Sequence, residues 1–167
     1  MTANADLHLK PRQLYAIGLY ASQWAYFEAE MNSTIAALGE LVEKKQTMPT
    51  RFKERAGRWR ILVLAQYKEH PKMLKEAGAI IDDAIELHKS RSIILHGRVY
   101  GHPEPRSRYL YIEGHRHLNE WRVEFRVTTA ALIIVGAELV KRLAERLIEF
   151  NEKHLPVSPI PLPRRYL

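Results

Sequence analysis

The chain contains no cysteine among its 167 residues. This absence excludes disulfide bonds, thiolate nucleophiles and cysteine-ligated zinc, and nothing in the composition points to an oxidising compartment. Long apolar runs are also missing: the longest, 130–137, is followed by Glu138 and falls far short of the roughly 20 residues needed to span a bilayer. No basic, apolar, small-residue leader opens the sequence. We therefore expect a cytoplasmic protein that has no membrane partner.

Acidic residues are fewer than basic ones, at 19 against 26, which gives a formal net charge of +7 and a pI near 9.7. This balance favours polyanionic partners without choosing among them. The length and the 46% hydrophobic content suit one domain with its own core, which we place at residues 1–154. We find no phosphate-binding glycine loop, nucleophile elbow or dinucleotide fingerprint, and we expect no cofactor.

Four segments repeat apolar residues with the 3.6-residue period of an amphipathic helix. They span residues 11–44, 51–67, 71–96 and 128–154. Pro11 and Pro71 suit the first turn of a helix, Thr128 is a suitable N-cap, and Gly97 is placed to end the third helix in a left-handed cap. The inward stripes predicted for the first and fourth helices are Leu14, Ile17, Ala21, Trp24, Glu28, Ile35 and Val42, and Leu132, Val135, Leu139, Leu143, Leu147 and Phe150.

Between the third and fourth helices the apolar period falls to two, as expected for a β-hairpin. Residues 109–113 and 121–127 form its strands across a loop at 114–119, and 98–100 can add a third strand. We predict a mainly α fold, an antiparallel four-helix bundle with a β-hairpin at about 98–127 inserted between helices three and four. The proline-rich arm at 155–167 cannot be helical, and is either disordered or extended over a neighbour.

The third helix carries an arginine in the middle of its apolar stripe. This stripe reads Ala77, Ile81, Ala84, His88, Arg91 and Leu95. A guanidinium in that position needs an acceptor, because it keeps its charge and its burial without a partner is costly. Glu28 is a carboxylate in the middle of the first helix's stripe, so we expect Glu28 to meet and orient Arg91. Arg91 either forms a structural ion pair with a carboxylate or lies in a cleft where it binds an anion.

Arg91 is followed by Ser92, Ile93, Ile94 and Leu95 and then by His96, at the end of a long helix and directly before a glycine. In this setting the sequence resembles the HEPN superfamily, helical-bundle proteins with an Arg, four to six residues, His signature. The resemblance implies a metal-independent ribonuclease, a toxin or defence effector that works as a homodimer with both signatures facing one cleft. Arg91 and His96 would be its catalytic residues, and Ser92 holds the position where members usually carry a polar residue. RNA and an antitoxin or other protein are the partners it implies.

Cleavage of RNA by its own 2′-hydroxyl needs a base, an acid and positive charge near the phosphorane. Histidine can be the base or the acid, and arginine can hold phosphate oxygens with two hydrogen bonds. On an ideal helix, however, Arg91 and His96 lie about 140° apart and share a face only if the helix relaxes near Gly97. His88, four residues before Ser92, is either a core histidine or a second base.

Three further sets of residues leave alternatives open. Arg51, Arg55 and Arg58 share one face of the second helix, which is either a solvated face paired with Glu54 or a track for nucleic-acid phosphates. His102, His115 and His117 lie in or beside the hairpin, and are either solvated or metal ligands, although no carboxylate at ligand spacing completes a set. The alternative to an enzyme is a non-catalytic helical module for protein or nucleic acid, in which Glu28 and Arg91 form an internal clamp.

Overall fold

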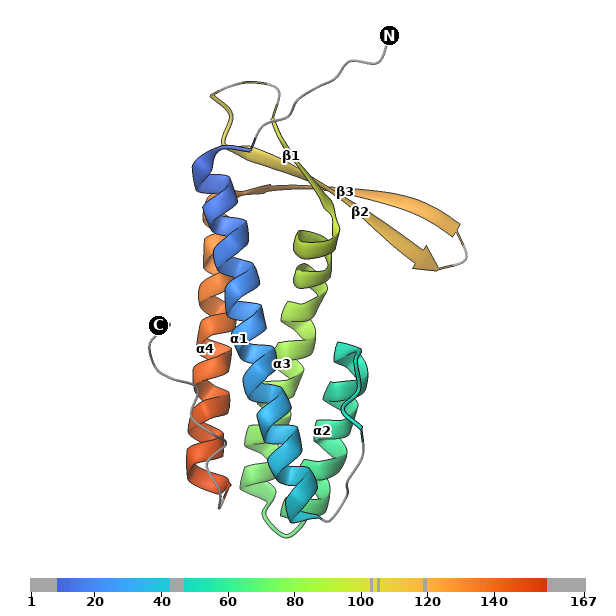
Figure 1. The fold of residues 1–167 in the computed structure, drawn as a ribbon, viewed down its shortest axis with the longest axis vertical. Coiled ribbons are helices and arrows are strands. Elements are labelled where there is room, and N and C mark those ends of the chain that lie inside the picture. The colour runs from blue at the N-terminus through green and yellow to red at the C-terminus, as the bar shows by residue number, and fades with distance from the viewer. Residues whose placement is uncertain (1–8, 43–46, 103, 105, 119, 156–167) are drawn as a thin grey trace. The chain divides into compact units, whose positions relative to one another are not determined.

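The computed structural model describes residues 9–42, 47–102, 104, 106–118 and 120–155, and of 114–118 and 120–125 the backbone alone. Its elements follow in the order α1 (Pro11–Leu41), α2 (Phe52–Tyr67), α3 (Pro71–His96), β1 (Arg98–Gly101), β2 (Tyr109–Leu118), β3 (Glu120–Thr129) and α4 (Ala130–His154) (Figure 1). The protein is mainly helical with a small antiparallel sheet, as the sequence predicts. In the described part of the chain, no helix has both the length and the apolar character that crossing a membrane requires.

The chain divides into two compact units. The sheet unit comprises Met1–Trp24 and Leu87–Val140, and the helical unit comprises Ala25–Glu86 and Lys141–Leu167. Helices α1, α3 and α4 each contribute residues to both units. The single domain expected for residues 1–154 stays a prediction, and the arm predicted from residue 155 lies, apart from Leu155, outside the described residues.

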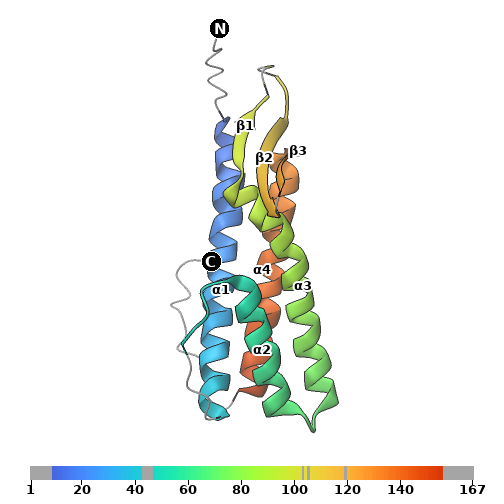
Figure 2. The same cartoon turned by 90° about the vertical axis from the view of Figure 1, so that its right-hand side faces the viewer.

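Four helical segments make up the helical unit (Figure 2), and each contributes buried apolar side chains. Its fully buried side chains include Phe27, Met31, Ile35, Leu38, Trp59, Leu62, Ile80, Ile81, Leu147 and Phe150. Polar contacts also join the segments: Asn151 Nδ2 donates to Thr34 Oγ1 over 2.8 Å, which ties α4 to α1. Ion pairs between Arg60 and Asp82 and between Arg146 and Asp83 link α3 to α2 and to α4. The apolar core and these contacts hold the four segments together.

Glu30 is a buried carboxyl group of this unit, at 9% exposure, and its burial raises its pKa above the ordinary value of 4.5. The folded protein therefore holds a proton on Glu30 where the unfolded chain loses it, so stability falls as the pH rises above 4.5. We expect Glu30→Gln, which mimics the protonated carboxyl, to be more stable than the parent at pH 7 and to lose that advantage below pH 4.5.

Urea midpoints of the parent and of Glu30→Gln at both pH values measure this difference. The matched control is Glu40→Gln, which makes the same substitution at an exposed position of the same helix and is expected to gain less stability at pH 7 than Glu30→Gln gains. A Glu30→Gln advantage that is independent of pH would contradict the assignment.

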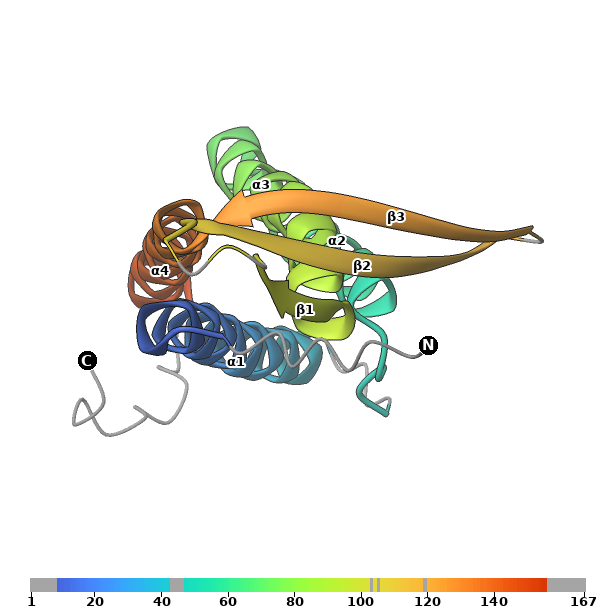
Figure 3. The ribbon, with the colours of Figure 1, turned by 90° about the horizontal axis from the view of Figure 1, so that it is seen from above.

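The sheet unit contains a three-stranded sheet in the order β1-β2-β3, with both pairs antiparallel (Figure 3). In the register, Tyr111 of β2 lies opposite Tyr100 on one side and Val127 on the other. The loop predicted at 114–119 is wrong, because β2 continues to Leu118 and β3 begins at Glu120. Residues 114–118 therefore pair with β3, although apolar and polar residues alternate less regularly there than in 121–127.

The apolar stripes predicted for α1 and α4 are wrong at four positions, all of them in the sheet unit. Leu14 is 55% exposed, and Leu132, Val135 and Leu139 are between 46% and 62% exposed. Their places in the core are taken by Ala16, Tyr20, Ile133, Ala137 and Val140. Both helices have apolar residues on more than one face, so periodicity alone does not select the buried one. The predicted core positions Trp24, Ile35, Leu143, Leu147 and Phe150 are confirmed.

Helix α4 also begins later than predicted, because Thr128 and Thr129 belong to β3, where they pair with Leu110 and Tyr109. The cap is Thr129, whose Oγ1 accepts the Leu132 N–H at 3.3 Å. Thr128 is therefore a strand residue.

Gly97 ends α3 for a different reason than the one predicted. Its φ is outside the left-handed region, so the left-handed cap is wrong. A Cβ at this position would lie 2.5 Å from the Ile93 carbonyl oxygen, 2.7 Å from Ile112 Cγ2 and 2.9 Å from the Glu113 carbonyl oxygen. The chain needs glycine here because α3 ends directly against β2.

Candidate functional site

Arg91 and His96 meet in the last turns of α3. Arg91 Nη1 lies 3.1 Å from His96 Nε2, although the two residues are five positions apart on the helix. The long side chain of Arg91 reaches around the helix to His96, although the two residues point in different directions from the helix axis. A guanidinium can only donate, so His96 Nε2 is the acceptor and a neutral ring in this arrangement carries its proton on Nδ1. His96 is exposed and Arg91 is half-buried, which places the pair at the surface of the sheet unit.

The guanidinium of Arg91 lies over the indole ring of Trp24. The guanidinium carbon lies 6.0 Å from the Trp24 ring centroid, within cation–π range. His88 meets the same indole edge-on, with ring centroids 5.9 Å apart. Trp24 is only 1% exposed, so it is a fixed surface against which two side chains of α3 are positioned. The sequence identifies Trp24 as a core residue but gives no sign of this role.

Tyr20 lies one turn before Trp24 on α1 and is a second buried aromatic side chain beneath the site. Burial raises its pKa, although a contact with Trp24 and the positive charge of Arg91 act in the opposite direction. Its hydroxyl is therefore neutral at physiological pH. A Cβ at Gly136 of α4 would approach the Tyr20 ring to 3.0 Å, so the glycine lets this aromatic ring lie close to the helix.

Of the other predicted site residues on α3, Ser92 is exposed beside Arg91, and His88 is half-buried against Trp24. Glu28 lies in the helical unit, where its Oε2 is 3.2 Å from Arg55 Nη2. The pairing of Glu28 with Arg91 stays a prediction.

The three arginines predicted to share a face on α2 take up different environments. Arg51 is exposed and lies 3.8 Å from Glu54, as the solvated alternative predicts. Arg58 Nη1 donates to the Thr47 carbonyl oxygen at 3.5 Å. Arg55 is turned inward, is 9% exposed and also donates to Asn32 Oδ1 at 3.2 Å. The structure therefore does not bring all three to one exposed surface.

The inward position of Arg55 leads to a testable prediction. Replacing Arg55 with alanine leaves the Glu28 carboxylate half-buried without this cation, and we expect a loss of about 3 kcal/mol in the free energy of unfolding. Urea denaturation of Arg55→Ala measures the loss. The matched control is Arg51→Ala, whose exposed ion pair is expected to contribute less than about 1 kcal/mol. Equal losses in the two variants would show that the Arg55 pair is not structural.

The histidines considered as metal ligands are only partly described. The His102 ring stacks on Tyr111 at 5.5 Å between centroids, and its Nδ1 accepts the Glu104 N–H at 3.0 Å. The side chains of His115 and His117 lie outside the described residues. Within the described part of the chain, no three potential ligand side chains cluster around one point.

No protein-family model, curated protein or solved structure matches this chain.

Proposed function

We propose that the protein is an HEPN-like, metal-independent RNA endonuclease in which Arg91 and His96 are the active pair. The observation that supports this proposal best is the 3.1 Å contact between Arg91 Nη1 and His96 Nε2. One side chain of the pair is held over Trp24 and the other is exposed. A permanent cation beside an accessible imidazole is the combination that phosphodiester cleavage by a 2′-hydroxyl needs.

The contact suggests an order of events. An RNA phosphate accepts hydrogen bonds from the Arg91 fork, which releases the Nε2 lone pair of His96. His96 then accepts the 2′-hydroxyl proton while O2′ forms a bond to phosphorus. The bond from phosphorus to O5′ breaks, and O5′ takes up a proton from an acid. The products are a 2′,3′-cyclic phosphate and a free 5′-hydroxyl.

We propose a homodimer because the reaction needs a general acid that protonates O5′ in addition to the general base. One copy supplies one Arg91 and one His96, whereas the reaction needs a base and an acid at the same phosphate. A two-fold dimer brings two histidines to one cleft, so that one can act as the base and its mate as the acid. We propose in addition that the four helices form one antiparallel bundle carrying the hairpin, and that the enzyme acts in the cytoplasm as a toxin or defence effector.

A second candidate is a non-catalytic module that binds a protein or nucleic acid. It is favoured by Leu132, Val135 and Leu139, three exposed apolar side chains at i, i+3 and i+7 spacing on α4. This spacing places them on one helix face, as expected for a surface that packs against another helix.

Cleavage of end-labelled RNA in EDTA by the purified full chain distinguishes the two candidates. The ribonuclease is expected to leave cyclic-phosphate ends, and a single 2′-deoxynucleotide at a cleavage position should block cutting there. Absence of cutting at every protein concentration tested, or cutting at the deoxynucleotide, would contradict the proposed reaction. In the first case the binding module becomes the better account.

A further inference from the structure

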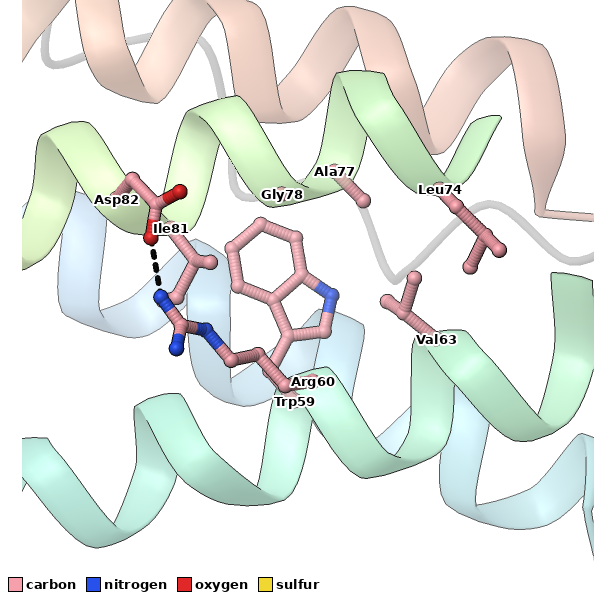
Figure 4. Close-up of a pocket in the computed structure, with 8 residues that line it drawn as sticks. All are labelled: Trp59, Arg60, Val63, Leu74, Ala77, Gly78, Ile81 and Asp82. Atoms are coloured by element: carbon pink, nitrogen blue, oxygen red, sulfur yellow. Dashed lines mark hydrogen bonds and ion pairs between the residues drawn. The ribbon is translucent and has the colours of Figure 1, made fainter. Parts of the chain in front are cut away.

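A groove in the helical unit lies between α2 and α3 (Figure 4). It has a volume of about 460 Å³, within the range of roughly 300–1,000 Å³ that is typical of small-molecule sites. Its lining residues are Trp59, Arg60, Val63, Leu74, Ala77, Gly78, Ile81 and Asp82. The α3 wall is open because Ala77 and Gly78 are small, and a Cβ at Gly78 would meet no atom within 4 Å.

The indole N–H of Trp59 is a polar group inside this groove. Trp59 is 1% exposed, and its Nε1 has no hydrogen-bond partner among the described residues. Figure 4 shows this nitrogen turned toward the end of the groove lined by Val63 and Leu74. A buried donor left without an acceptor costs free energy, and an indole can only donate. A molecule that fits this position would therefore present an acceptor oxygen to Trp59.

The opposite end of the groove carries the ion pair between Arg60 and Asp82 (Figure 4). The two side chains are 53% and 67% exposed and have opposite charges, so together they add no net charge at this end. The rest of the lining is aliphatic or aromatic. These features favour an uncharged ligand over an anion, because Arg60, the cation among the described lining residues, is paired with Asp82.

We propose that this groove binds a small, uncharged, mainly apolar carbonyl compound, whose oxygen accepts the Trp59 indole N–H and whose apolar body covers Gly78. The proposal is independent of RNA cleavage, since all the residues that line the groove belong to the helical unit.

A pair of isosteric probes tests the hydrogen bond. 2-Acetylnaphthalene and 2-isopropenylnaphthalene have nearly the same shape, but only the first carries a carbonyl oxygen. Titrated into the ¹⁵N-labelled full chain, the ketone is expected to bind about ten-fold more tightly and to move the Trp59 indole N–H resonance downfield. Equal affinity of the two probes, or an indole resonance that does not respond to the ketone, would overturn the proposal.

Variants of Gly78 test the location. Gly78→Leu fills the groove and is expected to lower ketone affinity at least ten-fold, whereas Gly78→Ala is the matched control and should retain it. Alanine and leucine both favour helix over glycine, so α3 is expected to remain folded in each variant. Unchanged affinity in Gly78→Leu would place binding elsewhere. The anionic 2-naphthoate tests the charge preference, and tighter binding of 2-naphthoate than of the ketone would contradict an uncharged ligand.

Discussion

Replacing Gly97 with alanine is expected to lower the free energy of unfolding by about 3 kcal/mol, at the upper end of typical overpacking effects. The new methyl group would lie 2.5 Å and 2.9 Å from two carbonyl oxygens and 2.7 Å from Ile112 Cγ2. Two of these three neighbours are backbone atoms, which cannot turn aside as a flexible side chain can. Relief requires that the last turn of α3 shift away from the new methyl group and that β2 move away from α3, and this movement would expose the buried side chain of Ile112. Urea denaturation, analysed for a change in midpoint at constant slope, measures the loss.

Gly18→Ala is the matched control. Gly18 belongs to the same sheet unit and lies within α1, but a Cβ there would meet no atom within 4 Å. Since alanine favours helix over glycine, this substitution is expected to leave stability unchanged or raise it by up to about 1 kcal/mol. If Gly97→Ala were as stable as Gly18→Ala, the close approach of α3 to β2 would be wrong.

Replacing either Arg91 or His96 with alanine is expected to lower the rate of RNA cleavage about a thousand-fold, within the usual range for a general base or a charge-stabilising donor. His96 is exposed and Arg91 is half-buried, so neither alanine should prevent folding. The loss should appear in the rate at saturating RNA for His96→Ala. For Arg91→Ala it should appear in RNA affinity as well, because the guanidinium is proposed to hold the phosphate.

Control variants separate catalysis from general charge. Arg91→Lys keeps the charge but loses the planar fork, and an intermediate loss is expected. Arg12→Ala and His70→Ala remove the same residue types at exposed positions and should cut like the parent. Losses in these two variants as large as those at Arg91 and His96 would argue against a site at the end of α3.

The ends of α3 and its buried stripe could be predicted from the sequence because local signals determine them. Pro71 begins the helix, the helix ends directly before Gly97, and Ala77, Ile81 and Ala84 are buried as predicted. The reason for the glycine could not be predicted, since the atoms it avoids include two residues of β2, which lies further along the chain. The prediction of burial failed for Leu14 of α1 and for three leucine and valine positions in the first half of α4 for the same reason: several helix faces there are apolar, and only the packing partners select one.

The candidate site was predictable in its residue types and unpredictable in its geometry. The spacing of Arg91 and His96 on an ideal helix argues against contact, and only the reach of the arginine side chain resolves the objection. Trp24 comes from a helix about 70 residues earlier, so no local pattern links it to Arg91. For Arg55 the spacing was misleading in the opposite direction. Helical spacing groups it with exposed arginines, whereas its side chain is buried in contacts with Glu28 and Asn32.

The most direct test of the proposed function is the initial rate of RNA cleavage in EDTA for the parent and His96→Ala, purified in parallel. The parent is expected to cut with turnover and to leave cyclic-phosphate ends, and the folded variant is expected to cut about a thousand-fold more slowly. Equal rates in the two preparations, or no cutting by the parent at any concentration, would contradict the proposed function.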